Sequence, residues 1–169
     1  MFHRILVGVD DSRAAREALD RAIEMVQAGH GRLGLLSSAP APPPLAAAGP
    51  AVVPVSRKQL ESELLDWARR NVEEAARLVP EEIPITKIVT RGAASAALRR
   101  EARSGCWDLV VVGQSGRRHW LLGTVGERLG RRGDVPVLVV HDSAEPPRER
   151  RPRLRLWPRR RRRPQPTIA

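Results

Sequence analysis

WDLVVVGQSGRRHWLLGTVGERL, residues 107–129, is the stretch of sequence that decides the fold. It opens with an apolar run typical of a buried strand, passes through four glycines between Gly113 and Glu127, and ends in a pattern typical of a helix. Each glycine weakens a helix or strand by about 0.5–1 kcal/mol. Four of them between a strand and a helix therefore indicate a loop that needs bare backbone, as loops that hold anions do.

The rest of the chain alternates strand and helix patterns. Further apolar runs typical of strands occupy residues 4–10, 32–38, 83–92 and 135–140. Helical spacing follows Ser12, an expected N-cap, and recurs over residues 56–79, 94–105 and 124–132. Regular alternation of this kind predicts an α/β fold, in which a parallel sheet carries helices on both faces.

The charge of the chain is concentrated near its C-terminus. Of the net charge of +11, residues 148–169 contribute ten arginines and one glutamate, so the remainder is almost neutral. We expect residues 143–169 to form a disordered Arg/Pro-rich tail and residues 1–142 to form a single domain with a Pro/Ala-rich internal loop at residues 39–55. The tail suits contact with nucleic acid or an anionic membrane, or it is a solvated extension without a dedicated partner.

Cysteine content and hydropathy favour a soluble cytoplasmic protein. The single cysteine, Cys106, excludes an internal disulfide and is expected to be a small packing residue. Residues 33–55 carry no charge but contain six prolines, which disfavour a membrane-spanning helix. The first eleven residues lack the long apolar run of a signal peptide.

The glycine loop suits a phosphate group. If its strand lies beside the first strand, Asp10 faces the same crevice beyond the carboxyl ends of the strands. Gly113 and Gly116 would let backbone N–H groups approach an anion. Gly123 and Thr124 would open a helix, whose N-terminus favours phosphate.

No pattern in the sequence predicts catalysis or a metal site. The Walker pattern is excluded because no Gly-Lys-Ser/Thr triplet occurs, and the first strand continues as GVDDSRAA rather than as a dinucleotide-binding fingerprint. Paired carboxylates, a Ser-His-Asp order and a Cys-His pair are not apparent, and the histidines lack metal-ligand spacing. We therefore expect a protein that is not an enzyme.

Three motifs together resemble the universal stress protein family: ILVGVDDS at residues 5–12, GQSG…GTVGERL at residues 113–129 and VPVLVV at residues 135–140. The resemblance covers residues 4–140. It implies a Rossmann-like, five-stranded parallel sheet of order 3-2-1-4-5, usually in a homodimer, and a regulatory role in stress response with at most slow incidental ATP hydrolysis. In the nucleotide-binding branch, a Gly-x2-Gly-x9-Gly-Ser/Thr pattern holds the phosphates and ribose of ATP.

The resemblance implies a site for ATP or another adenine nucleotide such as AMP. Residues at the ends of the strands would face the adenine and ribose, and residues of the glycine loop would hold the phosphates. Mg²⁺ would enter only through the nucleotide. The implied site residues are Val9, Asp10, Ser38, Val112, Gly113, Gly116, Gly123, Thr124, Val125 and Gly126.

The glycine loop departs from the family pattern in length. Only six residues separate Gly116 from Gly123, where the pattern has nine. The retained glycines favour nucleotide binding, whereas the shorter loop favours a second interpretation: a dimeric interaction domain without nucleotide that acts through its basic tail. In both, the apolar last strand, Val135 to Val140, is expected to lie at the sheet edge and to pair with a second copy.

Overall fold

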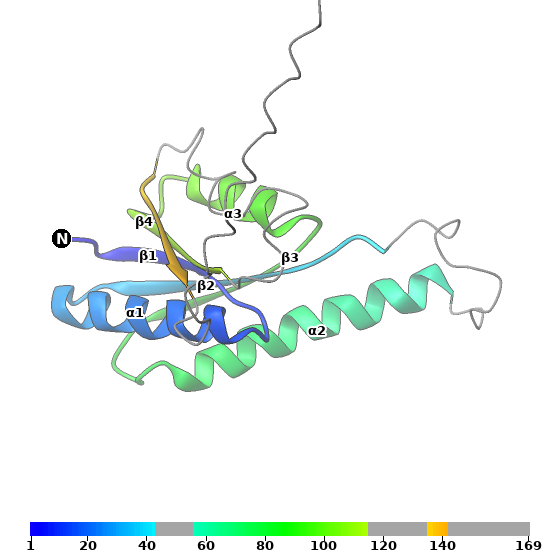
Figure 1. Cartoon of the computed structure of the whole chain (residues 1–169), viewed down its shortest axis with the longest axis horizontal. Helices are drawn as coiled ribbons and strands as arrows, with labels where there is room; N and C mark the ends of the chain where they lie inside the picture. Colours follow the sequence, from blue (N-terminus) through cyan, green and yellow to red (C-terminus); the bar gives the residue numbers. More distant parts are fainter. Residues whose placement is uncertain (43–55, 115–134, 142–169) are drawn as a thin grey trace, which may run out of the picture.

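A computed structural model describes residues 1–42, 56–114 and 135–141 of the chain (Figure 1). Strands and helices alternate in these residues, and the five strands form one sheet in the order β3-β2-β1-β4-β5, with all pairs parallel. The predicted α/β fold and strand order are therefore confirmed. The elements are β1 (Arg4–Gly8), α1 (Arg13–Gly29), β2 (Arg32–Ala39), α2 (Arg57–Leu78), β3 (Ile85–Arg91), α3 (Ala94–Ala102), β4 (Leu109–Gln114) and β5 (Val137–His141).

Several predicted segments lie outside the described residues. They are most of the Pro/Ala-rich loop, the helix expected at residues 124–132 and the basic tail. β2 reaches Ala39, the first residue of the expected loop. None of the helices in the described ranges is long and apolar enough to cross a membrane.

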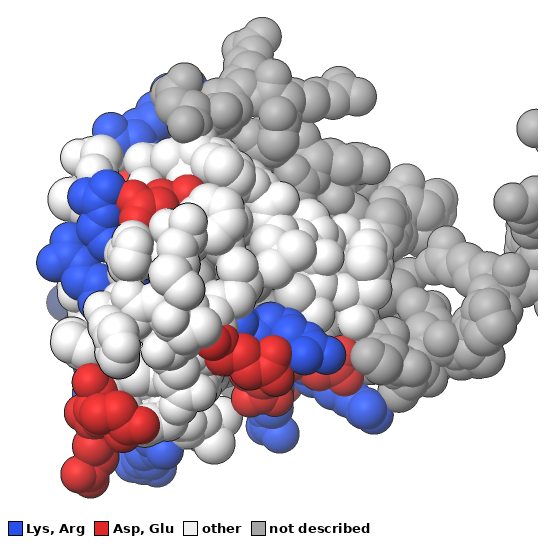
Figure 2. Space-filling view, turned by 90° about the vertical axis from the view of Figure 1, so that its left-hand side faces the viewer, with Lys and Arg blue, Asp and Glu red and all other residues white. Residues whose placement is uncertain are grey.

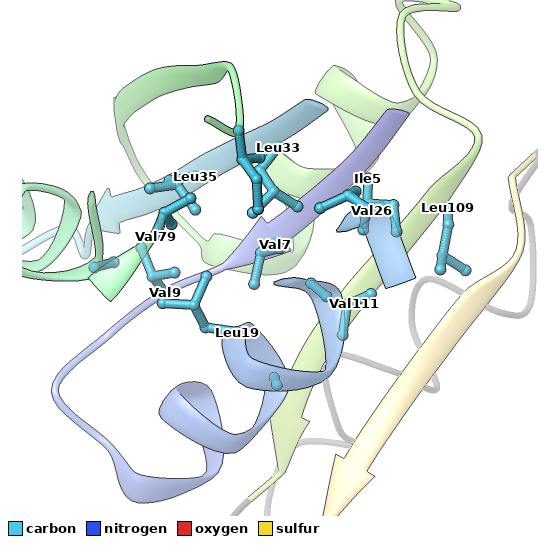
Figure 3. Packing of buried hydrophobic residues seen from close by; sticks show 14 of the residues in the cluster. Ile5, Val7, Val9, Leu19, Val26, Leu33, Leu35, Val79, Leu109 and Val111 are labelled. Atoms are coloured by element: carbon cyan, nitrogen blue, oxygen red, sulfur yellow. The ribbon is translucent and has the colours of Figure 1, made fainter. Parts of the chain in front are cut away.

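The two faces of the sheet carry separate apolar clusters. Figure 1 shows α1 and α2 on one face and α3 on the other. Ile5 and Val7 of β1 pack in the cluster under α1 and α2, shown in Figure 3, whereas Leu6 packs in the cluster under α3. Successive strand residues point to opposite faces, and both faces are covered. This is why the inner strands β1 and β4 appear in the sequence as continuous apolar runs.

The helices begin where the sequence provides caps. The Ser12 hydroxyl accepts the backbone N–H of Ala15 at 3.1 Å, as predicted, and the Ser56 hydroxyl accepts that of Gln59 at 3.2 Å. Such caps stabilise a helix by about 1 kcal/mol. α1 ends at Gly29, and the residue that follows it in the left-handed region is His30 (φ 50°).

Two local predictions need correction. β5 begins at Val137 rather than at residue 135, because Pro136 has no N–H to donate to the sheet; its carbonyl still accepts the N–H of Val110 at 3.0 Å. Cys106 is exposed and is not a packing residue. The chain turns at Gly105 (φ 74°), and the buried position is occupied by Trp107 instead.

An ion pair joins the amino ends of β1 and β4. The Arg4 Nε donates to Asp108 Oδ1 at 3.0 Å, and the backbone N–H groups of His3 and Arg4 donate to Asp108 Oδ2 at 3.2 and 3.1 Å. The hydrogen bond from the Arg4 side chain, supported by these N–H groups, holds the pKa of Asp108 below its usual value. The carboxylate is therefore a stronger acid in the folded chain than in the unfolded chain.

We predict that this pair contributes to acid stability. A lowered folded-state pKa stabilises the fold above the unfolded-state value of about 3.9, and this contribution is lost as the pH falls through the folded-state pKa. Asp108→Asn should flatten the dependence of unfolding free energy on pH below about pH 4, measured by urea unfolding at successive pH values. Asp66→Asn is the control, because it also removes one carboxylate, but from an exposed ion pair with Arg69. Equal pH dependence in the two variants would contradict the prediction.

Candidate functional site

The carboxyl ends of β1, β2 and β4 meet at one edge of the sheet. Gly8 at the end of β1 is in register with Leu36 of β2 and Val112 of β4. The chain leaves β1 toward β2 on one side and later returns to place β4 on the other, so the strand order reverses between β1 and β4. In open α/β sheets this reversal is where ligands bind.

The structure brings five of the ten predicted site residues to this edge. They line a hollow of about 110 Å³, and the other five lie outside the described residues. The five that line the hollow are Val9, Asp10, Ser38, Val112 and Gly113. The five outside the described residues are Gly116, Gly123, Thr124, Val125 and Gly126. The described residues of the predicted site therefore lie together in the structure.

Asp10 lies exposed in the turn between β1 and α1. Its Oδ1 accepts the backbone N–H of Ser12 at 2.9 Å. This bond is typical of Asp in turns, and it holds the carboxylate between the end of β1 and the first turn of α1. The position allows the carboxylate to accept hydrogen bonds from hydroxyl groups of a bound molecule.

The Ser38 hydroxyl is used within the fold. It donates to the carbonyl of Gly92 at 2.8 Å and accepts from the Thr90 hydroxyl at 3.2 Å. Because a hydroxyl has one proton to donate, Ser38 has none left for a ligand. Its main observed role is to tie the end of β2 to the end of β3.

The position of Gly113, at the end of β4, has no room for a side chain. A Cβ built at this position would collide with the backbone of Ala14 and Ala15 in the first turn of α1. Backbone cannot move aside as the tip of a side chain can. Gly113 is therefore required for packing, and this requirement exists without any bound anion.

Val9 and Val112 present little surface to the hollow. They are 6% and 4% exposed and belong to the apolar clusters on opposite faces of the sheet. Their exposed edges form an apolar floor between the two clusters. Such a floor suits contact with a flat apolar group more than a hydrogen-bonded one.

Sequence reasoning missed Trp67 as a site residue. Trp67 falls within the helix predicted at residues 56–79, and in the structure its side chain lines the hollow from α2. Helical spacing identifies the side of a helix, but it does not show which residues lie beyond the ends of the strands. The signal available in the sequence was the length of the helix relative to the strand before it.

A second and larger hollow of about 390 Å³ lies between α1 and α2. It shares Val9, Asp10 and Ala15 with the first but is not lined by Ser38, Val112 or Gly113. We place the candidate site in the smaller hollow, because this one lies where the strand order reverses and contacts all three strand ends. Among the described residues, no group of His, Cys, Asp and Glu side chains is arranged to hold a metal ion.

Fold and site together define a doubly wound parallel α/β protein with a crevice at the switch point. The model of the universal stress protein family matches residues 1–141, and the chain belongs to this family. A universal stress protein family structure from Burkholderia pseudomallei is similar, with 27% identity, a TM-score of 0.62, and coverage of 81% of this chain and 94% of that one.

Two more distant structures carry a nucleotide in their descriptions. One is an Arabidopsis thaliana family member with AMP bound, at 17% identity and a TM-score of 0.51, covering 84% of this chain and 93% of that one. The other is an Archaeoglobus fulgidus universal stress protein in complex with dAMP, at 15% identity and a TM-score of 0.57, covering 82% of this chain and 97% of that one. At these identities, the likeness establishes the shared fold.

We predict that Gly113→Ala destabilises the fold in the absence of any ligand. The added methyl group meets helix backbone, so the loss should be about 3 kcal/mol of unfolding free energy, at the upper end of overpacking costs. Urea unfolding followed by circular dichroism measures it. Gly8→Ala is the matched control, because its Cβ would meet side-chain atoms and no backbone: Leu98 at 3.3 Å and Val112 at 3.4 Å. Equal stability of the two variants would contradict the close packing of α1 on β4.

Proposed function

We propose that the chain is a regulatory module that binds an adenine nucleotide in the crevice at the carboxyl ends of β1, β2 and β4. The observation that carries this proposal is the convergence of Val9, Asp10, Ser38, Val112 and Gly113, from three separate strand ends, on one hollow. AMP and dAMP in the two nucleotide-bound family structures support the choice of ligand.

The proposed division of work follows from the chemistry of these groups. Asp10 accepts hydrogen bonds from the ribose hydroxyls, and the apolar edges of Val9 and Val112 contact the base. The glycine loop from Gly113 to Gly126 offers backbone N–H groups to phosphate, and Mg²⁺ enters only with the nucleotide. A helix dipole contributes about 0.3–1 kcal/mol, whereas micromolar affinity needs about 8 kcal/mol, so base and ribose contacts must supply most of the affinity.

The length of the loop bears on which nucleotide is preferred. Six residues rather than nine between Gly116 and Gly123 leave less chain to surround a triphosphate. We propose that AMP is accommodated at least as well as ATP. We assign the module no catalytic role beyond slow incidental ATP hydrolysis.

We predict measurable heat in calorimetric titrations of the protein with AMP, ADP or ATP at millimolar concentration. Asp10→Asn should weaken binding about 10-fold or more, because a hydrogen bond to a charged group contributes about 1.5–3 kcal/mol. Asn retains an oxygen that can accept the Ser12 N–H, so the turn is preserved. Asp11→Asn, the adjacent exposed carboxylate, is the matched control and should bind as the unsubstituted protein does.

A second candidate function rests on charge. The described residues contain fifteen Lys and Arg against fourteen Asp and Glu, and Figure 2 shows both signs interspersed on one face. The excess positive charge of the chain therefore lies outside them, mainly in residues 148–169. If no nucleotide gives heat, and heparin retains the full chain but not a chain ending at residue 147, the nucleotide proposal is wrong and contact of the tail with nucleic acid or anionic membrane takes its place.

We also propose that the protein is a homodimer formed through β5. β5 is an edge strand of the described sheet, and Leu138 on it is 36% exposed. An apolar edge with free N–H and C=O groups favours pairing with another strand. A twofold axis would let two copies of β5 satisfy each other.

We predict that Leu138→Lys converts a dimer into a monomer, because it places charges within the shared contact. Light scattering at tens of micromolar measures the mass. Thr86→Lys on β3, the opposite edge strand, is the control and should leave the dimer intact. A monomeric mass for the unsubstituted protein would refute the dimer.

A further inference from the structure

α2 extends beyond the carboxyl edge of the sheet. The helix has 22 residues, about 33 Å at 1.5 Å per residue. Asn71, in its second half, donates from its side-chain amide to the Ser37 hydroxyl at 3.4 Å, close to the end of β2. The residues of α2 that precede Asn71 therefore continue past the end of β2, as Figure 1 shows. Trp67 lies one turn before Asn71, at the point where the helix passes the end of the strand.

Trp67 is the only aromatic side chain among the described residues that line the crevice hollow. The other lining side chains are aliphatic or small, apart from Asp10, Ser37 and Ser38. Trp67 is only partly buried. It therefore presents indole surface to the same space as the predicted base-contacting residues, Val9 and Val112.

The chain contains a second described tryptophan that shows what a purely structural one looks like. Trp107 is 5% exposed, its Nε1 donates to Glu101 at 3.1 Å, and its ring occupies the space that a Cβ at Gly34 would need. Trp67 differs in exposure and in hydrogen bonding, since it is more exposed and its N–H has no hydrogen-bond partner within the described part of the chain. Buried indole N–H groups usually find a partner. Trp107 therefore has the features of a packing residue, whereas Trp67 has those of a residue that lines a ligand site.

We propose that Trp67 is the residue on which the adenine base stacks, an assignment that rests on the proposed nucleotide-binding function. A base offers a flat π face, and an indole ring is the best-matched flat surface that a protein can present to it. Val9 and Val112 supply aliphatic contact to the base from the strand ends, and Trp67 supplies aromatic contact from α2 in the same hollow. The crevice is thereby selective for ligands that carry an aromatic base over ligands that carry only a sugar phosphate.

The test compares variants of Trp67 and Trp107 in the full-length chain. Trp67→Leu should weaken AMP binding in calorimetry about 10-fold or more, as removal of a base-stacking aromatic does, and should leave the urea unfolding midpoint close to that of the unsubstituted protein. Trp107→Phe should have the opposite pattern, with lower stability and nearly unchanged AMP affinity.

A fluorescence measurement separates stacking from an indirect effect. Adenine stacked on an indole quenches its emission, so AMP should quench the tryptophan fluorescence of the unsubstituted protein and of Trp107→Phe. In Trp67→Phe, which keeps an aromatic ring for stacking, AMP should still bind within about 3-fold of the original affinity, because the aromatic π face remains, and the quenching should be lost. All chains in this measurement also carry Trp120→Phe, because Trp120 belongs to the glycine loop and its emission would report the nucleotide as well.

The outcomes distinguish the two proposals. AMP binding that is unchanged in Trp67→Leu, or quenching that persists in Trp67→Phe, overturns the role of Trp67 while nucleotide binding stands. An unsubstituted protein that binds no adenine nucleotide overturns the proposed function and the stacking assignment together. A Trp67→Leu chain that unfolds at much lower urea shows a packing residue and also overturns the assignment.

Discussion

The direct contact between the first turn of α1 and the bare backbone of Gly113 is the constraint on which the crevice depends. It joins the start of α1 to the end of β4, two segments about a hundred residues apart in the sequence. Because Ala14 and Ala15 press on β4 at this point, the turn from β1 into α1 is held against the end of the neighbouring strand. Asp10, which lies in that turn, is thereby fixed beside β4 at the point where the strand order reverses.

The same contact separates two requirements for glycine that sequence alone cannot separate. A glycine after a strand is compatible with an anion-binding loop and with a close approach of another backbone. At Gly113 the structure shows the close approach of another backbone. Whether the loop also binds an anion is decided by ligand-binding measurements. A motif can therefore be retained in a chain for packing reasons even if its ligand is lost.

Most of the fold was predictable because a parallel sheet covered on both faces leaves a strong trace in the sequence. The inner strands β1 and β4 appear as continuous apolar runs, the edge strand β3 is interrupted by Thr86 and Lys87, and Ser12 marks the start of α1. The error at Cys106 arose because a turn at Gly105 gives the buried position to Trp107. The hydrogen bonds of the Ser38 hydroxyl could not be predicted, because their partners Thr90 and Gly92 are more than fifty residues away in the sequence.

The candidate site also contains residues that the sequence predicts and one, Trp67, that it does not. Its strand residues were predictable from their places at strand ends, because parallel strands bring their carboxyl ends to one edge. The position of Trp67 was not predictable, since it depends on how far α2 runs past β2, and this follows from the packing of α2 on the sheet through Val72 and Ala75 together with the hydrogen bond between Asn71 and Ser37.

The hydrogen bonds within this crevice bear on how it can recognise a ligand. The Ser38 proton is committed to Gly92, the Ser37 hydroxyl accepts from Asn71, and one Asp10 oxygen accepts from Ser12. The polar groups of the described crevice therefore maintain the fold before any ligand arrives. What remains for recognition in the described crevice is the Asp10 carboxylate, the proton of the Ser37 hydroxyl and surfaces that are apolar or aromatic. Such a surface distinguishes ligands with a flat base from ligands without one, but it discriminates weakly between closely related bases, because stacking needs only a π face.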